Sequence, residues 1–381
     1  MRLVLSRRRR GVIAVLGAGV LTSGVLAVAL PAYATGSTFY ASPTGSGSCS
    51  QASPCALATA VSDAGDGDTV VLADGLYSDV VLSLTKSSTL ISASPGVATV
   101  QGEGGGIAPV TVNAGAPTLD NLSIGQPSQD SGGAVAVSAG ALTIEDSTLT
   151  SNLSVGGGSS ATVDGSSFGN GAAIGGLAGS TISINDSTVG GGIDGSGSVS
   201  AVRSTIDGGI GGLGPGLSHL TLLNSTVNHG LAGVLINGSA TITDSTITGA
   251  GATGIGGSGN VSLLDSTIAN VGGTGVIANG GAWTIQDTTI TGNGGNGIDA
   301  DGATVALRAS IVADNATPDC QGGGISDNGY DLDDDGSCHL TGPGSVSDIP
   351  IISNYLEPIS NNGGATQTVP LLTVPSPSTT T

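Results

Sequence analysis

The chain has 381 residues, 68 of them Gly, and a formal net charge of −20. Its 28 acidic residues stand against eight basic ones, and a surface this acidic repels phosphate groups, which excludes nucleic-acid binding by ordinary modes. Aromatic residues make up only 2% of the chain, which excludes a core of stacked rings, while a hydrophobic fraction of 38% excludes a disordered polyanion.

The N-terminus has the pattern of an export signal. Residues 7–10 are all Arg, an uncharged stretch covers 11–30, and Ala32-Tyr33-Ala34 has the small residues of a cleavage site. We therefore expect a signal peptide over 1–34 and a mature chain that is secreted or held at the cell surface. The alternative is an uncleaved anchor, because the apolar stretch is about long enough to span a bilayer. No second run of that length follows, so the mature chain is expected to have no membrane span.

The cysteines agree with export. Cys49 and Cys55 lie near one end of the chain, and Cys320 and Cys338 lie near the other. Four cysteines allow three connectivities, and proximity in sequence favours the two local disulfides. Neither pair has the spacing of a zinc site.

Residues 35–66 are expected to form an N-terminal cap. Within it, 56–64 reads as a short amphipathic helix that covers the first turn of the domain and protects its strand edge. Strand-like segments follow at 69–72, 79–84, 88–92 and 97–101.

The body of the chain is a repeat. An apolar residue, any residue, Asp or Asn, Ser, Thr and a second apolar residue recur in this order, as in I-T-D-S-T-I at 242–247. The closing apolar residues of the copies are Ile124, Leu149, Phe168, Val189, Ile206, Val227, Ile247, Ile268, Ile290 and Ile311. A period near 21 residues sustained over these copies predicts a solenoid.

The pattern inside each copy selects the kind of solenoid. Apolar residues alternate, and a third apolar position follows about eight residues after the closing one, as Ile255 follows Ile247. Three short strands per repeat, separated by Gly, Asn and Asp turns, predict an all-β parallel β-helix of about 21 residues per rung over 67–315. The frame of a leucine-rich repeat is absent.

One position of the repeat is expected to form a structural ladder, because Asp and Asn stabilise turns by bonding to nearby backbone. The residues that carry it are Asn121, Asp146, Asp186, Asn224, Asp244, Asp265 and Asp287. Gly165, Arg203 and Arg308 hold the same position in other copies, and the arginines are expected to compensate charge locally. The Ser and Thr residues that follow suit hydroxyl bonds between rungs.

The far end contains the one candidate metal site. Residues 316–372 are expected to close the solenoid, with a disordered tail over 373–381. Asp331, Asp333 and Asp335, followed by Gly336, match the first half of a calcium loop, and calcium is the only cofactor that the sequence suggests. The Glu expected at the twelfth position is absent, so the predicted affinity is weak. The alternative is a solvated acidic turn.

Both ends resemble known families. The segments T-F-Y-A-S-P-T-G-S-G-S-C at 38–49 and G-D-T-V-V-L-A-D-G-L-Y at 67–77 resemble the N-terminal cap of exported right-handed parallel β-helix proteins of the pectin-lyase-like superfamily. The segments D-N-G-Y-D-L-D-D-D-G-S-C at 327–338 and N-N-G-G-A-T-Q-T-V-P-L-L at 361–372 resemble the choice-of-anchor Q type of bacterial surface protein. The resemblance implies a right-handed β-helix and no particular reaction.

The predicted function is a secreted or cell-surface scaffold that binds a carbohydrate or surface ligand without catalysis. The alternative is a polysaccharide lyase, glycoside hydrolase or lectin of the pectin-lyase-like fold. The resemblance implies that Arg203 or Arg308 would be the base of a lyase, but both belong to the repeat, and no catalytic residue is identified. Trp283, the only Trp, stands where other copies have Leu, Ile or Val, and is predicted to fill the core.

Overall fold

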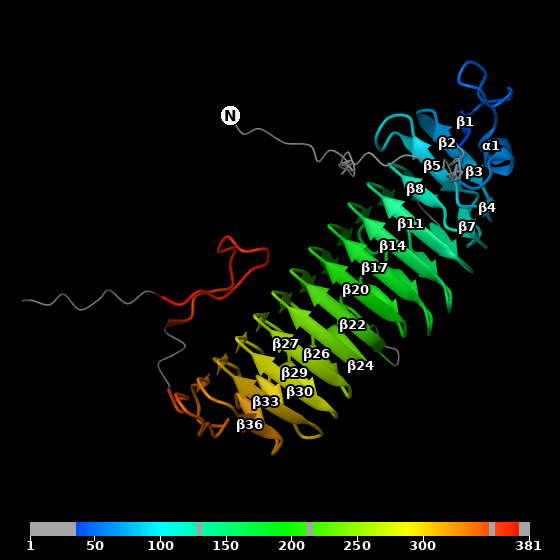
Figure 1. Cartoon of the computed structure of the whole chain (residues 1–381). Coiled ribbons are helices and arrows are strands. Elements are labelled where there is room, and N and C mark those ends of the chain that lie inside the picture. Colours follow the sequence, from blue (N-terminus) through cyan, green and yellow to red (C-terminus); the bar gives the residue numbers. More distant parts are fainter. Residues whose placement is uncertain (1–35, 128–131, 212–215, 350–354, 373–381) are drawn as a thin grey trace, which may run out of the picture. The chain divides into compact units, whose positions relative to one another are not determined.

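The chain folds as an all-β parallel solenoid, as the repeat predicts (Figure 1). The computed structural model describes residues 36–127, 132–211, 216–349 and 355–372. The expected signal peptide at 1–34 and the tail at 373–381 lie outside these ranges. Within them, no helix has the length and apolarity needed to cross a bilayer.

The strands stack on three faces, named A, B and C here, and every strand–strand pairing between successive turns is parallel. Face A consists of β1 (Thr38–Ala41), β2 (Thr69–Leu72), β5 (Thr89–Ser92), β8 (Thr118–Asp120), β11 (Ala141–Glu145), β14 (Ser160–Asp164), β17 (Thr181–Asn185), β20 (Ser198–Val202), β22 (Leu217–Leu223), the second half of β24 (Ala232–Thr243), β27 (Asn260–Leu264), β30 (Ala282–Gln286), β33 (Thr304–Arg308) and β36 (Ile325–Asp327).

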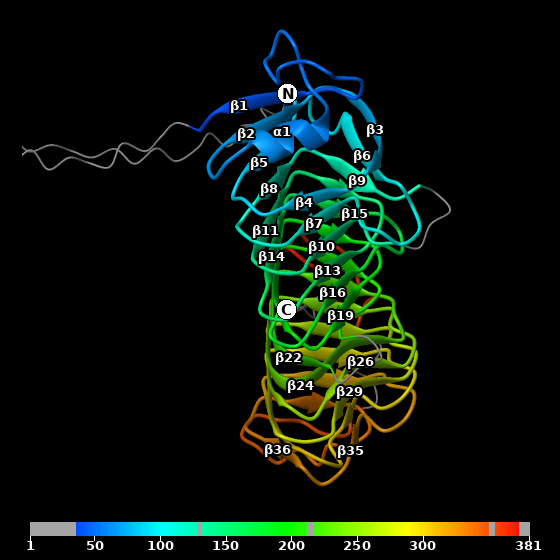
Figure 2. The ribbon, with the colours of Figure 1, turned by 90° about the vertical axis from the view of Figure 1, so that its right-hand side faces the viewer.

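Face B runs beside face A and is shown as a stack in Figure 2. It consists of β4 (Leu82–Leu84), β7 (Val110–Val112), β10 (Val135–Val137), β13 (Leu153–Val155), β16 (Ile174–Gly176), β19 (Ile193–Gly195), the first half of β24, β26 (Thr253–Gly257), β29 (Thr274–Ala278), β32 (Ile298–Asp299) and β35 (Cys320–Gln321). Ile210 bridges Ile193 and Val234, so face B continues from β19 to β24.

Face C is a sheet of 13 short strands. These are β3 (Gly75–Val80), β6 (Ala98–Gly102), β9 (Ser123–Gly125), β12 (Thr148–Leu149), β15 (Ser167–Phe168), β18 (Thr188–Val189), β21 (Thr205–Asp207), β23 (Thr226–Asn228), β25 (Thr246–Thr248), β28 (Thr267–Ala269), β31 (Thr289–Thr291), β34 (Ile311–Ala313) and β37 (Leu332–Asp333).

Alternate residues of each strand point inward and stack on their counterparts in the neighbouring turns. Ile247, Ile268 and Ile290 on face C are paired and fully buried, at spacings of 21 and 22 residues. Trp283 pairs with Val261 and is 1% exposed, which confirms that it fills the core. The interior is therefore built of apolar columns that run along the solenoid.

The predicted ladder residues occupy the corner between faces A and C, where the backbone turns with positive φ. Asp186 has a φ of +49° and Asp244 has the same value. Asp and Asn tolerate this left-handed conformation better than most residues, and Gly165 and Arg203 adopt it at the same corner. The shared property is therefore the backbone conformation. Arg203 also binds the carboxylate of Asp186 through Nε and Nη2, both at 2.7 Å, which confirms the local compensation of charge.

The residue after each corner belongs to a buried hydroxyl column. Ser204 N donates to Ser225 Oγ of the next turn at 3.0 Å, and Ser225 Oγ donates to Leu223 O at 2.8 Å. The bond from N–H to the hydroxyl of the next turn recurs along the column except between Ser266 and Thr288. The buried members of the column are Ser147, Ser166, Ser187, Ser204, Ser225, Ser245, Ser266, Thr288 and Ser310. The expected hydroxyl bonds between rungs are present, and they are buried.

The last copy of the repeat lies one residue later in the structure than the sequence pattern predicts. Ile290 pairs with Val312 and not with Ile311, and Val312 is the buried residue of the two. The corner conformation accordingly belongs to Ala309, with a φ of +50°, and Arg308 lies in β33. Two adjacent apolar residues and the absence of Asp at this corner removed the signal that fixes the register.

Three boundaries also differ from the sequence reading. The expected strand at 79–84 is split between β3 and β4 by a bend after an irregularity in β3. Parallel pairing extends from β1 to β37, past both limits of the 67–315 range, because the outer turns pair without carrying the Asp-Ser-Thr pattern. The segment 355–372 does not close the end. It bonds to face C, where Thr246 Oγ1 donates to Gln367 O and Thr366 Oγ1 donates to Asp244 O.

The two ends are closed by separate devices. Helix α1 (Leu57–Asp63) packs on β1, β2 and β4 through the buried side chains of Leu57 and Ala60, beside the disulfide Cys49–Cys55. At the other end the disulfide Cys320–Cys338 joins β35 to residues 334–349, which follow β37 and are called the closing loop. Val346 of that loop bridges Leu332, so it covers the edge of β37.

The hydroxyl column predicts an unequal pair of substitutions. Ser225→Ala leaves the buried N–H of Ser204 without its acceptor and should lower the free energy of unfolding by about 1–3 kcal/mol. Ser225→Thr keeps the hydroxyl, as Thr288 does in its own turn, and should cost clearly less. Urea denaturation of both variants checks this. Equal losses would show that the hydroxyl bonds are not what the column contributes.

Candidate functional site

Asp331, the first residue of the predicted calcium loop, ends the hydroxyl column. Ser310 N donates to Asp331 Oδ1 at 2.8 Å, as it would to a serine of the next turn. Asp331 N in turn donates to Ser345 Oγ at 3.0 Å. The side chain is 1% exposed, and its second oxygen, Oδ2, is buried without a hydrogen-bond partner. Asp331 therefore substitutes for a serine at the last turn.

The charge of Asp331 depends on its neighbours. Burial raises its pKa to about 7, and the negative charge of Asp327 adds to the increase. Burial also opposes ionisation of Asp327, but hydrogen bonds donated by Gly342 N, Ser345 Oγ and Gly329 N outweigh it and lower the pKa of Asp327 to about 2. A hydrogen bond between the side chains of Asp331 and Asp327 also raises the pKa of Asp331 and lowers that of Asp327, so a proton on Asp331 would be donated to the carboxylate of Asp327.

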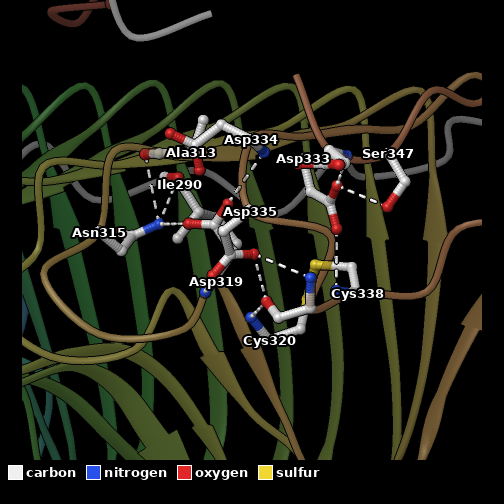
Figure 3. Close-up of a disulfide and its surroundings, with 12 residues drawn as sticks. Ile290, Ala313, Asn315, Asp319, Cys320, Asp333, Asp334, Asp335, Cys338 and Ser347 are labelled. Atoms are coloured by element: carbon white, nitrogen blue, oxygen red, sulfur yellow. Dashed lines mark hydrogen bonds between the residues drawn. A yellow bond between two sulfur atoms is a disulfide. The ribbon is translucent and has the colours of Figure 1, made fainter. Parts of the chain in front are cut away.

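Asp333 holds the closing loop in place (Figure 3). Its carboxylate is fully buried and accepts three hydrogen bonds, from Ser347 Oγ at 2.7 Å, Asp348 N at 2.9 Å and Cys338 N at 2.8 Å. These contacts use both oxygens. Asp333 is therefore a structural acceptor.

The structure does not gather Asp331, Asp333 and Asp335 around one point. Their carboxylates bond to different partners: Asp331 accepts from Ser310 N, Asp333 from Cys338 N and Asp335 from Ser337 Oγ. Within the described ranges, the group of three carboxylates whose oxygens lie within 4.8 Å of one another is Asp319, Asp334 and Asp335. The alternate-carboxylate arrangement of a calcium loop does not fit this segment, and calcium binding stays a prediction.

Asp319, which the sequence analysis did not identify, is buried and accepts a hydrogen bond at the end of a short series of Asn side chains. Asn293 N donates to Asn315 Oδ1 at 3.2 Å, and Asn315 Nδ2 donates to Asp319 Oδ1 at 2.8 Å. Burial raises the pKa of Asp319, and its contact with Asp334 acts in the same direction. Asp335 Oδ2 accepts a hydrogen bond from Asp319 N at 3.1 Å. The sequence signal was a pair of Asn residues 22 positions apart that leads to an Asp beside a cysteine.

A groove on face B is the largest hollow with an apolar lining among those described. It crosses β10, β13, β16 and β19 and has a volume of about 630 Å³, within the usual range for ligand sites. Its floor is made by the outward residues at the centres of these strands, which are Ala136, Ser154, Gly175 and Asp194. Leu177, which is 66% exposed, lines its side. We call this the face-B groove.

The groove exists because its floor residues are small. A Cβ placed on Gly175 would meet only Leu153 O, at 3.9 Å, so the space above this residue is open. Asp194 is the only carboxylate in the lining, and the lining has no basic residue. The sequence analysis did not identify the groove. Its signal is the short central residue at matching places in four turns, in the segments V-A-V, L-S-V, I-G-G and I-D-G.

The raised pKa of Asp331 predicts a dependence of stability on pH. Because the pKa in the folded protein, about 7, exceeds the ordinary value of 3.8, the native state binds the extra proton between these values. The stabilisation is complete below about pH 4 and is lost as the pH rises through about 7. Asp331→Asn keeps the acceptor for Ser310 N and removes the titration. Urea denaturation from pH 5 to pH 8 should show a smaller loss of stability for the variant than for wild type, and equal losses would contradict this account.

The role of Asp333 predicts a loss of stability that is independent of calcium. Asp333→Asn replaces one acceptor oxygen by a donor and should lower the free energy of unfolding by about 1–3 kcal/mol. Thermal unfolding in millimolar calcium and in chelator should give the same difference from wild type. If calcium raises the melting temperature of wild type and not of the variant, Asp333 is a ligand and the structural account of it is wrong.

Comparisons with known proteins give distant likenesses. No family model matches the sequence, and no curated protein matches it. Among solved structures, the catalytic domain of a GH87 α-1,3-glucanase is 10% identical with a TM-score of 0.44, over 73% of this chain and 64% of that one. A GH136 lacto-N-biosidase from Eubacterium ramulus is 11% identical with a TM-score of 0.43, over 82% and 67%. The pectate lyase Pel9A is 13% identical with a TM-score of 0.38, over 77% and 78%. At these values the activities of those proteins do not transfer to this chain, whose fold rests on its own strand pairing.

Proposed function

We propose that this chain is an extracellular protein that binds a neutral polysaccharide in the face-B groove without cleaving it. The observation that carries the proposal is the groove itself, which crosses four successive strands. At the spacing of about 4.8 Å between stacked strands, four turns span roughly 15 Å. An elongated hollow of this length fits a segment of a linear polymer better than a compact metabolite.

Charge selects a neutral ligand. The chain carries a net charge of −20, and the only charged side chain in the groove lining is that of Asp194. A polyuronate or a nucleic acid would meet repulsion both from the field of the whole molecule and from this carboxylate. Asp194 and Ser154 can instead accept hydrogen bonds from sugar hydroxyls, while Leu177 offers an apolar contact.

The lining of the groove supports binding without cleavage as the proposed role. Glycoside hydrolysis ordinarily uses two carboxyl groups about 5–10 Å apart, and the groove has one. A polysaccharide lyase or hydrolase is the alternative, and it requires catalytic groups elsewhere on the chain. The two disulfides suit an oxidising location outside the cell.

Filling the groove should abolish binding. Gly175→Leu places a side chain in the open space above β16 without straining the backbone, and affinity for the bound polysaccharide should fall at least about tenfold. Ser183→Leu, on face A of the same turn, is the matched control and should bind as wild type does.

The measurement is affinity electrophoresis with a panel of soluble neutral polysaccharides, followed by an assay for new reducing ends and unsaturated products. Equal retardation of the two variants would place the binding site elsewhere. Release of either product by wild type would replace the binding role with the enzymatic alternative.

A further inference from the structure

Two hollows lie along helix α1 at the N-terminal end of the solenoid. One has a volume of about 350 Å³ and the other of about 390 Å³. Ala58, Val81 and Leu82 line both, so the two hollows are adjacent at these residues. We call the combined hollow the capping-helix groove. It is separate from the face-B groove, whose lining shares no residue with it.

The middle of the capping-helix groove is apolar. Leu82 is 4% exposed and forms part of the floor, whereas Val81 is 52% exposed at the surface. Val61 of α1 and Leu84 of β4 continue the apolar lining toward one end. An exposed valine beside a hollow offers a contact for an apolar side chain of a ligand.

The two ends of the groove carry opposite charges. Lys86 lines the hollow beside the last turn of α1, together with Ser62, Ser83 and Ser88, and it is the only lysine of the 381 residues. Asp79 and Glu103 line the hollow beside the first residues of α1. The irregularity between Tyr77 and Val80 of β3 includes Asp79, which has a φ of +56°.

The charged ends match a ligand that carries one charge of each sign. Helix α1 has seven residues and is therefore about 10 Å long. Three residues of extended peptide span about the same length. A tripeptide with an apolar central residue would bring its carboxylate to Lys86, its ammonium group to Asp79 and Glu103, and its central side chain to Val81.

We propose that the capping-helix groove binds a short zwitterionic peptide, with the carboxylate held at Lys86 and the ammonium group at Asp79 and Glu103. A carbohydrate is disfavoured as its occupant because opposite full charges stand at the two ends. The one aromatic ring in the lining, that of Tyr77, is buried, and its hydroxyl already donates to the carbonyls of Ala41 and Ala73.

A structural role for the same charges makes a different prediction. Asp79 and Glu103 share their hollow with the first residues of α1, and Lys86 shares its hollow with Ala64 at the last turn. This arrangement would also stabilise the dipole of a helix that has no acidic residue in its first turn and no basic residue in its last. A purely structural role changes the melting temperature and leaves the recognition of peptide termini unaffected.

The test compares three forms of one peptide on the full chain by isothermal titration calorimetry. The probes are Ala-Leu-Ala with free termini, its N-acetylated form and its C-amidated form. Wild type should bind the free peptide at least about tenfold more tightly than either blocked form. Lys86→Met should remove the difference between the free and amidated peptides, and Asp79→Asn with Glu103→Gln should remove the difference between the free and acetylated ones.

Arg308→Met is the matched control, because it removes one positive charge from β33, outside the groove, and it should bind all three probes as wild type does. Melting temperatures of all variants are measured in parallel. The proposal is overturned if wild type binds none of the probes or does not distinguish them, or if Lys86→Met and Arg308→Met change binding equally. A fall in melting temperature with unchanged peptide discrimination would assign the charges to α1 alone.

Discussion

From Leu122 to Ser310, a backbone N–H is buried at the same corner of successive turns, and it must be given an acceptor. Apolar packing of the inward columns cannot supply one, and an unpaired buried N–H costs about 1–3 kcal/mol. The hydroxyl column answers this need, as when Ser204 N donates to Ser225 Oγ of the next turn. The same constraint fixes the left-handed backbone one residue earlier, where Asp, Asn or Gly is easily accommodated. The left-handed turn and the hydrogen bond between turns thus lie at adjacent residues of the same repeat.

A repeated hydrogen bond creates a difficulty at the last turn, where no further serine follows. Asp331 accepts from Ser310 N there, and Asp319 accepts from Asn315 at the end of the asparagine column. A carboxylate is a good acceptor, but burial disfavours its charge, so the pKa of each is raised. The column thus accounts for Asp331, while Asp333 accepts its hydrogen bonds from Cys338, Ser347 and Asp348.

The same constraint determines which positions are free to vary. Inward residues must be apolar and corner residues must turn, so outward residues carry whatever distinguishes one solenoid from another. On face B the outward residues of three adjacent turns, Ala136, Ser154 and Gly175, are small, and a groove results. Around α1 the exposed charges are instead divided by sign between the two ends of a hollow.

The sequence predicted the fold because the corner pattern is strict and recurs about every 21 residues. It failed where the pattern was absent. The corner residue of the last copy is Ala309 and not Asp, and two apolar residues, Ile311 and Val312, follow it side by side. The sequence therefore predicts Ile311 as the closing residue, whereas Val312 pairs with Ile290. The alternating acids at 331–335 match the spacing of a calcium loop, and the structure adds that Asp333 lies in β37, which pairs with β34; calcium binding there stays a prediction. The face-B groove depends on small outward side chains at matching places in several turns, and no single segment of the sequence shows that they coincide.

We propose that the small outward residues of face B bind a neutral polymer. A crystal structure of the protein with an oligosaccharide from a polysaccharide that it retains tests this most directly. The account predicts sugar rings along β10, β13, β16 and β19, with a hydroxyl bonded to Asp194 and no covalent change in the ligand. Sugar bound on another face, or a cleaved product lying beside carboxylates elsewhere, would contradict it.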